Sequence, residues 1–259
     1  MDKKPLEGQM KKLLASVVLC LPLFAHADTD ATADCQSHLS TWMKILHPGR
    51  QLDTEHAACK VWPADPSLTL AVQALPKAGN TDDEGEYDVE VLVADSKSGA
   101  IIAHEYEPAA ISSDAIRFSQ IDLDTARYQL TPQLRAFGVR VTYEGASRVN
   151  PYEGQALSLY VLDGRTLRRV VDNLTVENNS GEWDGNCAGT FSATTRTLAV
   201  GPANSAGYAT LRVGETSKES VSKQTSSDCV STDHPSKRTT TTLEYDGTAY
   251  RVPKALHYE

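Results

Sequence analysis

Thr239–Pro253 reads TTTTLEYDGTAYRVP, and this stretch decides the fold class. Its Asp246-Gly247 pair favours a two-residue type I′ turn, because both central residues of that turn need a positive φ. Folding the chain there sets Leu243 opposite Tyr250 on one apolar face and leaves polar side chains on the other. A slip of one residue would exchange the two faces, so the turn and the pattern agree on one register. The stretch predicts a half-buried antiparallel ribbon.

The same alternation of apolar and polar residues recurs along the chain and predicts further strands. These strands are expected at Leu68–Leu75, Tyr87–Val93, Ala100–Tyr106, Phe137–Tyr143, Leu157–Val161, Thr195–Val200 and Tyr208–Val213. Ile111–Leu134 is ambiguous between strand and helical turn. Asn173–Gly189 is predicted as a long polar loop, and the Ser/Thr/Lys-rich segment Ser217–Lys237 as a loop that only Cys229 would hold in place.

A second Asp-Gly pair, Asp163-Gly164, predicts another hairpin. A simple two-residue turn there would set Leu159 opposite Arg168, so a register slip or a bulge is expected. We therefore predict a mainly β protein, an antiparallel β-sandwich or paired sheets with a short N-terminal helix. A β-propeller-like array is the alternative, because two similar hairpins 83 residues apart fit propeller repeats of roughly 40–45 residues only if one blade is skipped.

The helix is predicted over Asp34–Gly49. Leu39, Trp42, Met43 and Leu46 follow the i, i+3, i+4, i+7 spacing of one helical face. Asp34 is the expected N-cap, and Pro48-Gly49 is a stop signal. Three histidines in and after this segment are nine residues apart, a spacing that matches no metal-binding motif. They are His38, His47 and His56.

Residues 1–27 have the features of a secretory signal peptide, with cleavage expected after Ala27. A basic start, with Met10 as an alternative initiator, precedes an apolar run from Leu13 to Phe24 that is too short to span a bilayer. A lipoprotein anchor at Cys20 is disfavoured, because the three residues before it are not small. We expect an exported protein, periplasmic or secreted, with no transmembrane segment in the mature chain.

Export changes the interpretation of the cysteines. The mature chain keeps four, and an even number in an oxidising compartment predicts disulfides. Three pairings are open, and we favour the sequential one, Cys35 with Cys59 and Cys187 with Cys229. Zinc is the rival interpretation, which the wide spacings and the absence of a Cys-x-x-Cys pair disfavour.

Length and charge limit the organisation and the partners. A region of helix and sheet is expected over 28–150 and a hairpin region over 151–259, the two forming one domain or two. Residues 1–27 carry four of the 25 basic residues and two of the 34 acidic ones, so the mature chain carries 21 against 32 and a net charge of −11. This charge repels nucleic acids and anionic lipids, so neither is an expected partner. The sequence leaves the oligomeric state open.

No motif for catalysis stands out. The sequence contains no Gly-x-Ser-x-Gly, no His-Glu-x-x-His, no Walker loop and no Gly-x-Gly-x-x-Gly. A hydrolase that uses two carboxylates stays open, because such residues are usually far apart in sequence and nothing selects a pair here. The sequence leaves catalysis open but favours a protein that is not an enzyme, and no cofactor is expected apart from the calcium considered next.

Two stretches are candidate binding sites. The first is an acidic loop that carries oxygen ligands of the type calcium prefers, although a solvated loop is the commoner explanation of such a run. Its candidate ligands are Asp82, Asp83, Glu84 and Glu86. The second is Gly181–Gly189, where Trp183, Asp184 and Asn186 could anchor a sugar ring or a protein partner. The competing explanation is that Trp183 packs over the disulfide of Cys187.

These observations favour a non-enzymatic exported binding protein. Its partner would be an extracytoplasmic enzyme that it inhibits, as an immunity-type protein does, or a glycan of the cell envelope. Two alternatives remain: a hydrolase of envelope polymers that uses an unidentified carboxylate pair, and a structural envelope component.

Overall fold

The computed structural model of the chain describes residues 28–50, 52–81, 84–205 and 207–258. The predicted signal peptide, residues 1–27, lies outside the described residues. No helix in the described ranges combines the length and the apolar character needed to cross a membrane.

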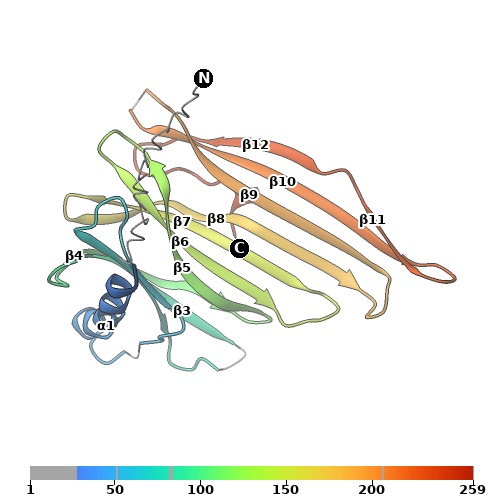
Figure 1. Cartoon of the computed structure of the whole chain (residues 1–259), viewed down its shortest axis with the longest axis horizontal. Coiled ribbons are helices and arrows are strands. Elements are labelled where there is room, and N and C mark those ends of the chain that lie inside the picture. Colours follow the sequence, from blue (N-terminus) through green and yellow to red (C-terminus); the bar gives the residue numbers. More distant parts are fainter. Residues whose placement is uncertain (1–27, 51, 82–83, 206, 259) are drawn as a thin grey trace, which may run out of the picture.

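Two antiparallel sheets form the molecule (Figure 1), which confirms the predicted class of mainly β protein with paired sheets. The small sheet contains, in spatial order, β1 (Ala57–Val61), β2 (Leu68–Pro76), β3 (Gly85–Asp95) and β4 (Ile101–Ser113). The large sheet begins with β5 (Ile116–Gln129), β6 (Arg135–Gly145), β7 (Tyr152–Asp163) and β8 (Thr166–Trp183). It continues with β9 (Gly189–Ala203), β10 (Ala209–Gln224), β11 (Cys229–Asp233) and β12 (Lys237–Leu243). The predicted boundary at residue 150 falls between β6 and β7, which are neighbours in the large sheet.

The helix α1 (Asp28–Leu46) and the two sheets form three layers. The helix begins six residues before the predicted N-cap Asp34, and its buried Leu39 and Trp42 pack on one face of the small sheet. The opposite face of that sheet packs on the large sheet, where Phe118 and Phe137 lie in the shared core. Because both faces of β2 and β3 are covered, each strand has an uninterrupted run of buried residues, Thr69–Leu75 in β2 and Asp88–Ala94 in β3.

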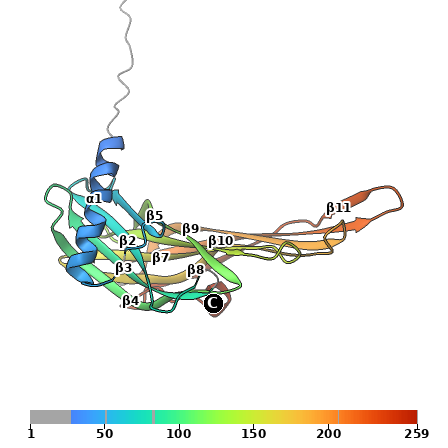
Figure 2. The ribbon, with the colours of Figure 1, turned by 90° about the horizontal axis from the view of Figure 1, so that it is seen from below.

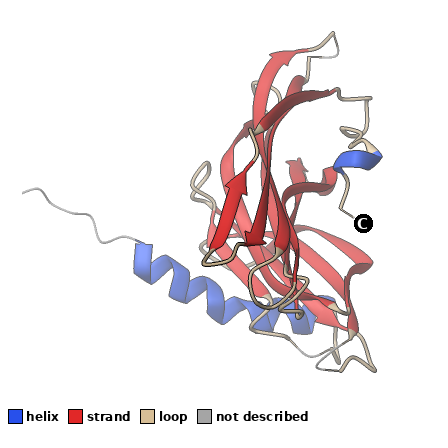
Figure 3. Ribbon diagram, turned by 90° about the vertical axis from the view of Figure 1, so that its right-hand side faces the viewer, coloured by secondary structure: helices blue, strands red, loops and turns tan. Residues whose placement is uncertain are grey.

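A second core lies against the C-terminal segment. β8 pairs with β9 only over Glu177–Trp183, and the first half of β8 pairs instead with the end of the chain. Tyr250 bridges Val171 there, and the buried Leu256 of a short 3-10 helix (Lys254–Leu256) belongs to the same core. Figure 3 shows both helical segments outside the strands.

The two Asp-Gly turns differ in outcome. The predicted ribbon over Thr239–Pro253 is wrong: Tyr250 bridges Tyr245 rather than Leu243, and β12 pairs with β10. Asp246 still makes a tight turn, because its Oδ1 accepts hydrogen bonds from the N–H groups of Thr248 and Ala249. Tyr250 is buried in the second core, and this burial keeps the segment after the turn from pairing with β12.

The turn at Gly164 confirms the second hairpin, between β7 and β8. Asp163 pairs with Thr166, and register shifts follow on both sides of Leu159, which therefore pairs with Val171. The turn residues are therefore Gly164 and Arg165, one position later than predicted, and this slip sets Arg168 opposite Val161. The expected irregularity is also present, because the register shifts move the partner of Leu159 from Val170 to Val171.

The far end of the large sheet forms a single-layered projection that we call the arm: residues 177–183 of β8, 189–197 of β9, 214–224 of β10, and β11. Figure 2 shows it extending away from α1 and the small sheet. No residue in these strands is buried. The predicted polar loops at Asn173–Gly189 and Ser217–Lys237 are thus wrong, because most of both segments is strand.

Both predicted disulfides are present. Cys35–Cys59 joins α1 to β1, and Cys187–Cys229 joins the β8–β9 turn to β11 at the end of the arm. Two disulfides fit a protein of an oxidising compartment outside the cytoplasm.

Candidate functional site

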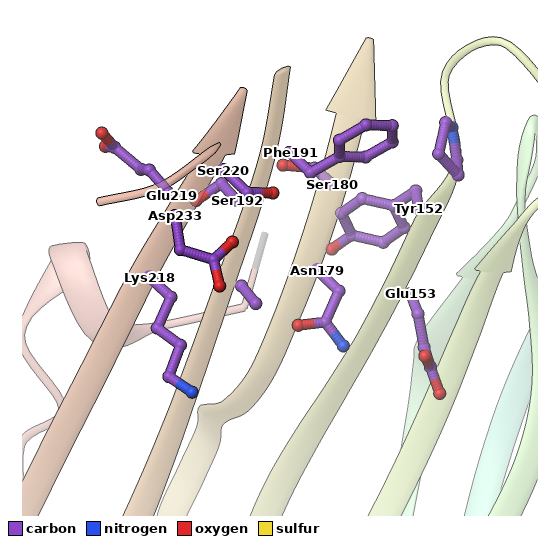
Figure 4. A pocket seen from close by; sticks show the side chains of 12 residues that line it. Tyr152, Glu153, Asn179, Ser180, Phe191, Ser192, Lys218, Glu219, Ser220 and Asp233 are labelled. Atoms are coloured by element: carbon purple, nitrogen blue, oxygen red, sulfur yellow. The ribbon is translucent and has the colours of Figure 1, made fainter. Parts of the chain in front are cut away.

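The arm and the adjoining start of β7 form a hollow of about 480 Å³ that opens to solvent (Figure 4). It lies across strands β7 to β11, and its size is within the roughly 300–1,000 Å³ usual for small-molecule sites. The residues that line it are Pro151, Tyr152, Glu153, Asn179, Ser180, Phe191, Ser192, Ala193, Lys218, Glu219, Ser220 and Asp233.

The strand register brings five of these side chains to one face of the sheet. Asn179 pairs with Ala193, which pairs with Lys218, and Phe191 pairs with Ser220, which pairs with Asp233. Residues paired across strands share a face, and so do residues two apart along a strand. One face of the sheet therefore carries the side chains of Phe191, Asn179, Lys218, Ser220 and Asp233.

Two glycines make room for the aromatic ring in this hollow. A Cβ atom at Gly181 would collide with Cδ1 of Phe191, and one at Gly189 would lie 3.0 Å from its Cε2. The ring therefore lies against the backbone of both positions, where any other residue would push it away. This arrangement covers the glycine backbone on one side of the ring and leaves the half-buried ring facing the hollow.

The charged groups of the hollow are not used by the fold. In the part of the chain that the structure describes, the side chains of Lys218, Asp233 and Glu153 make no hydrogen bond or ion pair within the protein, and all three are exposed. Asn179 donates one hydrogen bond to Glu177 at 2.8 Å and keeps its amide oxygen free. The site combines an apolar ring with donors and acceptors that are available to a ligand.

The sequence alone does not indicate this hollow. Phe191, Lys218 and Asp233 lie in or beside segments predicted as loops, so nothing placed them together. The usable signal was Gly181 and Gly189 around a single aromatic residue, since strand glycines often mark close approach of another group.

The predicted binding residues lie next to the hollow. Trp183 ends β8 and pairs with Gly189, which puts its half-buried side chain on the same face as Phe191. Asp184 Oδ1 accepts hydrogen bonds of 2.8 Å from the N–H groups of Asn186 and Cys187, and the first of these does most to lower the pKa of Asp184. Asp184 and Asn186 thus shape the turn that carries the disulfide. A binding role for these three residues stays a prediction.

The predicted calcium ligands are only partly described. Asp82 and Asp83 lie outside the described residues, Glu84 is exposed, and Glu86 Oε2 lies 3.0 Å from Nζ of Lys77. Within the described ranges, no group of three or more His, Cys, Asp or Glu side chains is arranged to hold a metal ion.

Asp88 and Glu90 are two buried carboxylates of β3, on the face toward α1. Burial raises the pKa of Asp88, but hydrogen bonds from the Ala109 N–H, Tyr106 and Arg50 outweigh it and lower that pKa to about 2. The Arg50 Nη1 lies 2.9 Å from Oδ2 of Asp88, whose side chain is 4 % exposed. Asp88 therefore anchors the segment after α1 to the sheet.

The carboxylate of Glu90 is likewise occupied by partners within the protein. Its Oε2 lies 2.6 Å from Nε2 of His47, and its Oε1 lies 3.0 Å from Nδ1 of His104. Burial, with a smaller effect of Glu105, raises the pKa of Glu90 to about 8. With 1 % of its side chain exposed, Glu90 has no free oxygen for a substrate.

Comparison with models of protein families, with curated proteins and with solved structures found no match.

Proposed function

We propose that this protein is an exported binding protein of the periplasm or the extracellular space, and that the arm is its binding surface. The observation that carries the proposal is a continuously paired part of the sheet whose strands contain no buried residue. β9 and β10 are joined by backbone pairs from Gly189–Ser222 to Val200–Leu211, yet none of the arm's strand residues is buried.

Construction and chemistry support a binding role. A disulfide fixes the end of the arm, which lowers the entropy that a ligand must overcome on binding. The hollow around Phe191 presents charged groups that no other part of the fold uses. Two classes of ligand fit this surface, an extracytoplasmic enzyme that the protein inhibits and a glycan of the envelope. A hydrolase is less well supported, because Asp88 and Glu90 are closed by their own partners.

Site-specific photo-cross-linking in living cells tests the proposal. A photoreactive amino acid replaces exposed Ala193 in the arm, and the control replaces exposed Arg117 in β5. We expect one dominant adduct, to a protein or a glycan, from position 193 and none from position 117. Equal adducts at both positions, or no adduct from the arm, would contradict the proposal, and turnover of purified envelope polymer would favour the hydrolase.

A further inference from the structure

We infer that the hollow around Phe191 binds a sugar ring of an uncharged glycan chain. This inference rests on the proposed binding function and selects one of its two ligand classes. It is carried by one aromatic platform and a rim of unpaired polar groups on the same face of the arm.

The platform is set by the backbone beneath it. Because Gly181 and Gly189 lack side chains, the Phe191 ring lies against the strands and not upright in solvent. Its free side is apolar and flat, which suits the C–H face of a pyranose ring. Burying such a surface stabilises a complex even where few hydrogen bonds form.

The polar groups of the rim can both donate hydrogen bonds to sugar hydroxyl groups and accept hydrogen bonds from them. Asp233 accepts hydrogen bonds, Lys218 donates them, and the free amide oxygen of Asn179 accepts another. Sugar hydroxyls are donors and acceptors at once, so they match this mixed set. A purely hydrophobic ligand would leave these groups unsatisfied.

Charge selects among glycans. Three carboxylates, Glu153, Glu219 and Asp233, and one ammonium, Lys218, line the hollow, and residues 28–259 carry a net charge of −11. Both fields repel an acidic polysaccharide. The hollow is open to solvent, so a chain can extend beyond the ring that it holds. The ligand is therefore an internal or terminal ring of a neutral chain.

Calorimetric titration of the purified, disulfide-bonded protein tests the inference. The probes are three neutral oligosaccharides, chitohexaose, cellohexaose and maltohexaose, with oligogalacturonate as the anionic comparison. We expect at least one neutral probe to bind and oligogalacturonate not to bind. Phe191→Ala should weaken the binding about tenfold, whereas Phe191→Tyr, which keeps the ring, should bind like the wild type.

Two further variants make the result specific. Val230→Ala is the matched control: Val230 is 48 % exposed in the same arm, and its pairing with Lys223 puts it on the opposite face. It should bind like the wild type. Asp233→Asn should reduce the discrimination against oligogalacturonate, a change that a merely structural role of Asp233 would not produce. Circular dichroism of each variant establishes that the sheet is intact.

The outcomes separate this inference from the proposed function. Failure of all three neutral probes, unchanged binding by Phe191→Ala, or tighter binding of oligogalacturonate would overturn the glycan assignment. If the arm then still cross-links to one protein in cells, the binding function stands with a protein partner. If the arm also fails to cross-link, both are wrong.

Discussion

The body of the molecule and its arm are both built from antiparallel strands, but the body buries them in cores and the arm exposes them to solvent. The body consists of α1, the small sheet, the C-terminal segment and the parts of the large sheet that line the cores. In β2 and β3 most residues are buried, whereas the arm's parts of β8, β9 and β10 contain no buried residue. Each region has one disulfide, but Cys35 and Cys59 are both buried, while Cys229 in the arm is exposed.

This difference assigns the stability of the fold to the body and leaves the arm available for binding. Burial of apolar area is the main favourable term in folding, so the body supplies most of the free energy of unfolding. The arm depends on backbone hydrogen bonds, on the preference of threonine for strands, and on the disulfide at its end. It can therefore present both faces to a ligand, at the expense of its own stability.

The largest expected effect comes from removing an aromatic ring in the body. Phe137 is fully buried between the sheets, so Phe137→Ala should lower the free energy of unfolding by about 3–5 kcal/mol. Phe191→Ala in the arm should lower it by about 1 kcal/mol or less, because little area is lost there. Urea unfolding followed by circular dichroism measures both. Similar losses for the two variants would show that the arm supports the global fold.

The disulfides sharpen the same comparison. Replacing Cys35 and Cys59 by serine should lower the global free energy of unfolding by roughly 3.5 kcal/mol in the loop-entropy model. Replacing Cys187 and Cys229 should mainly let the arm open locally, since no core opposes its fraying. Hydrogen exchange measures this: protection should fall in β9–β11 and persist in β2 and β3. Global destabilisation by the second pair would contradict the separation of arm and body.

The same contrast explains how much of the fold the sequence reveals. Strands with one or both faces in a core, such as β3 and β6, were predicted because burial imposes an alternation or an apolar run. The arm was missed because strands exposed on both faces need no apolar pattern, and Asn178, Asn179 and Ser180 resemble a loop. The return strand after Gly247 was wrong for another reason, because Tyr250 gains more by entering the second core than by pairing in a ribbon.

The candidate site was less predictable than the fold. Trp183 was selected for its polar loop and lies beside the hollow, but Phe191 was not selected at all. Its importance depends on Gly181 across one strand pair and on Asp233, which lies 42 residues further along the chain. Contacts across strands depend on the register of pairing, and that register can be inferred from sequence only where a buried face fixes it.

The smallest expected effect concerns a titratable group that only the body can bury. Burial raises the pKa of Glu90 to about 8, and burial also lowers the pKa of His47, which contacts it. The folded pair therefore keeps one proton up to about pH 8. The unfolded pair also holds one proton, on histidine, but loses it near pH 6.5. The folded state thus binds more protons between about pH 6.5 and 8, so stability should fall as the pH rises through this range, by the order of 1 kcal/mol.

Glu90→Gln tests this expectation, because glutamine keeps a neutral side chain of the same shape beside His47 and His104. Its free energy of unfolding, measured in urea from pH 6 to 9, should lack the loss that the wild type shows. Glu153→Gln is the matched control, since Glu153 lies exposed in the hollow of the arm and should leave the loss unchanged. A wild type whose stability is constant or rises over this range, or a Glu90→Gln variant with the same loss, would mean that the proton does not reside on the buried pair. A loss abolished by Glu153→Gln would instead place the titration in the arm and so contradict the contrast between a body that buries charge and an arm that exposes it.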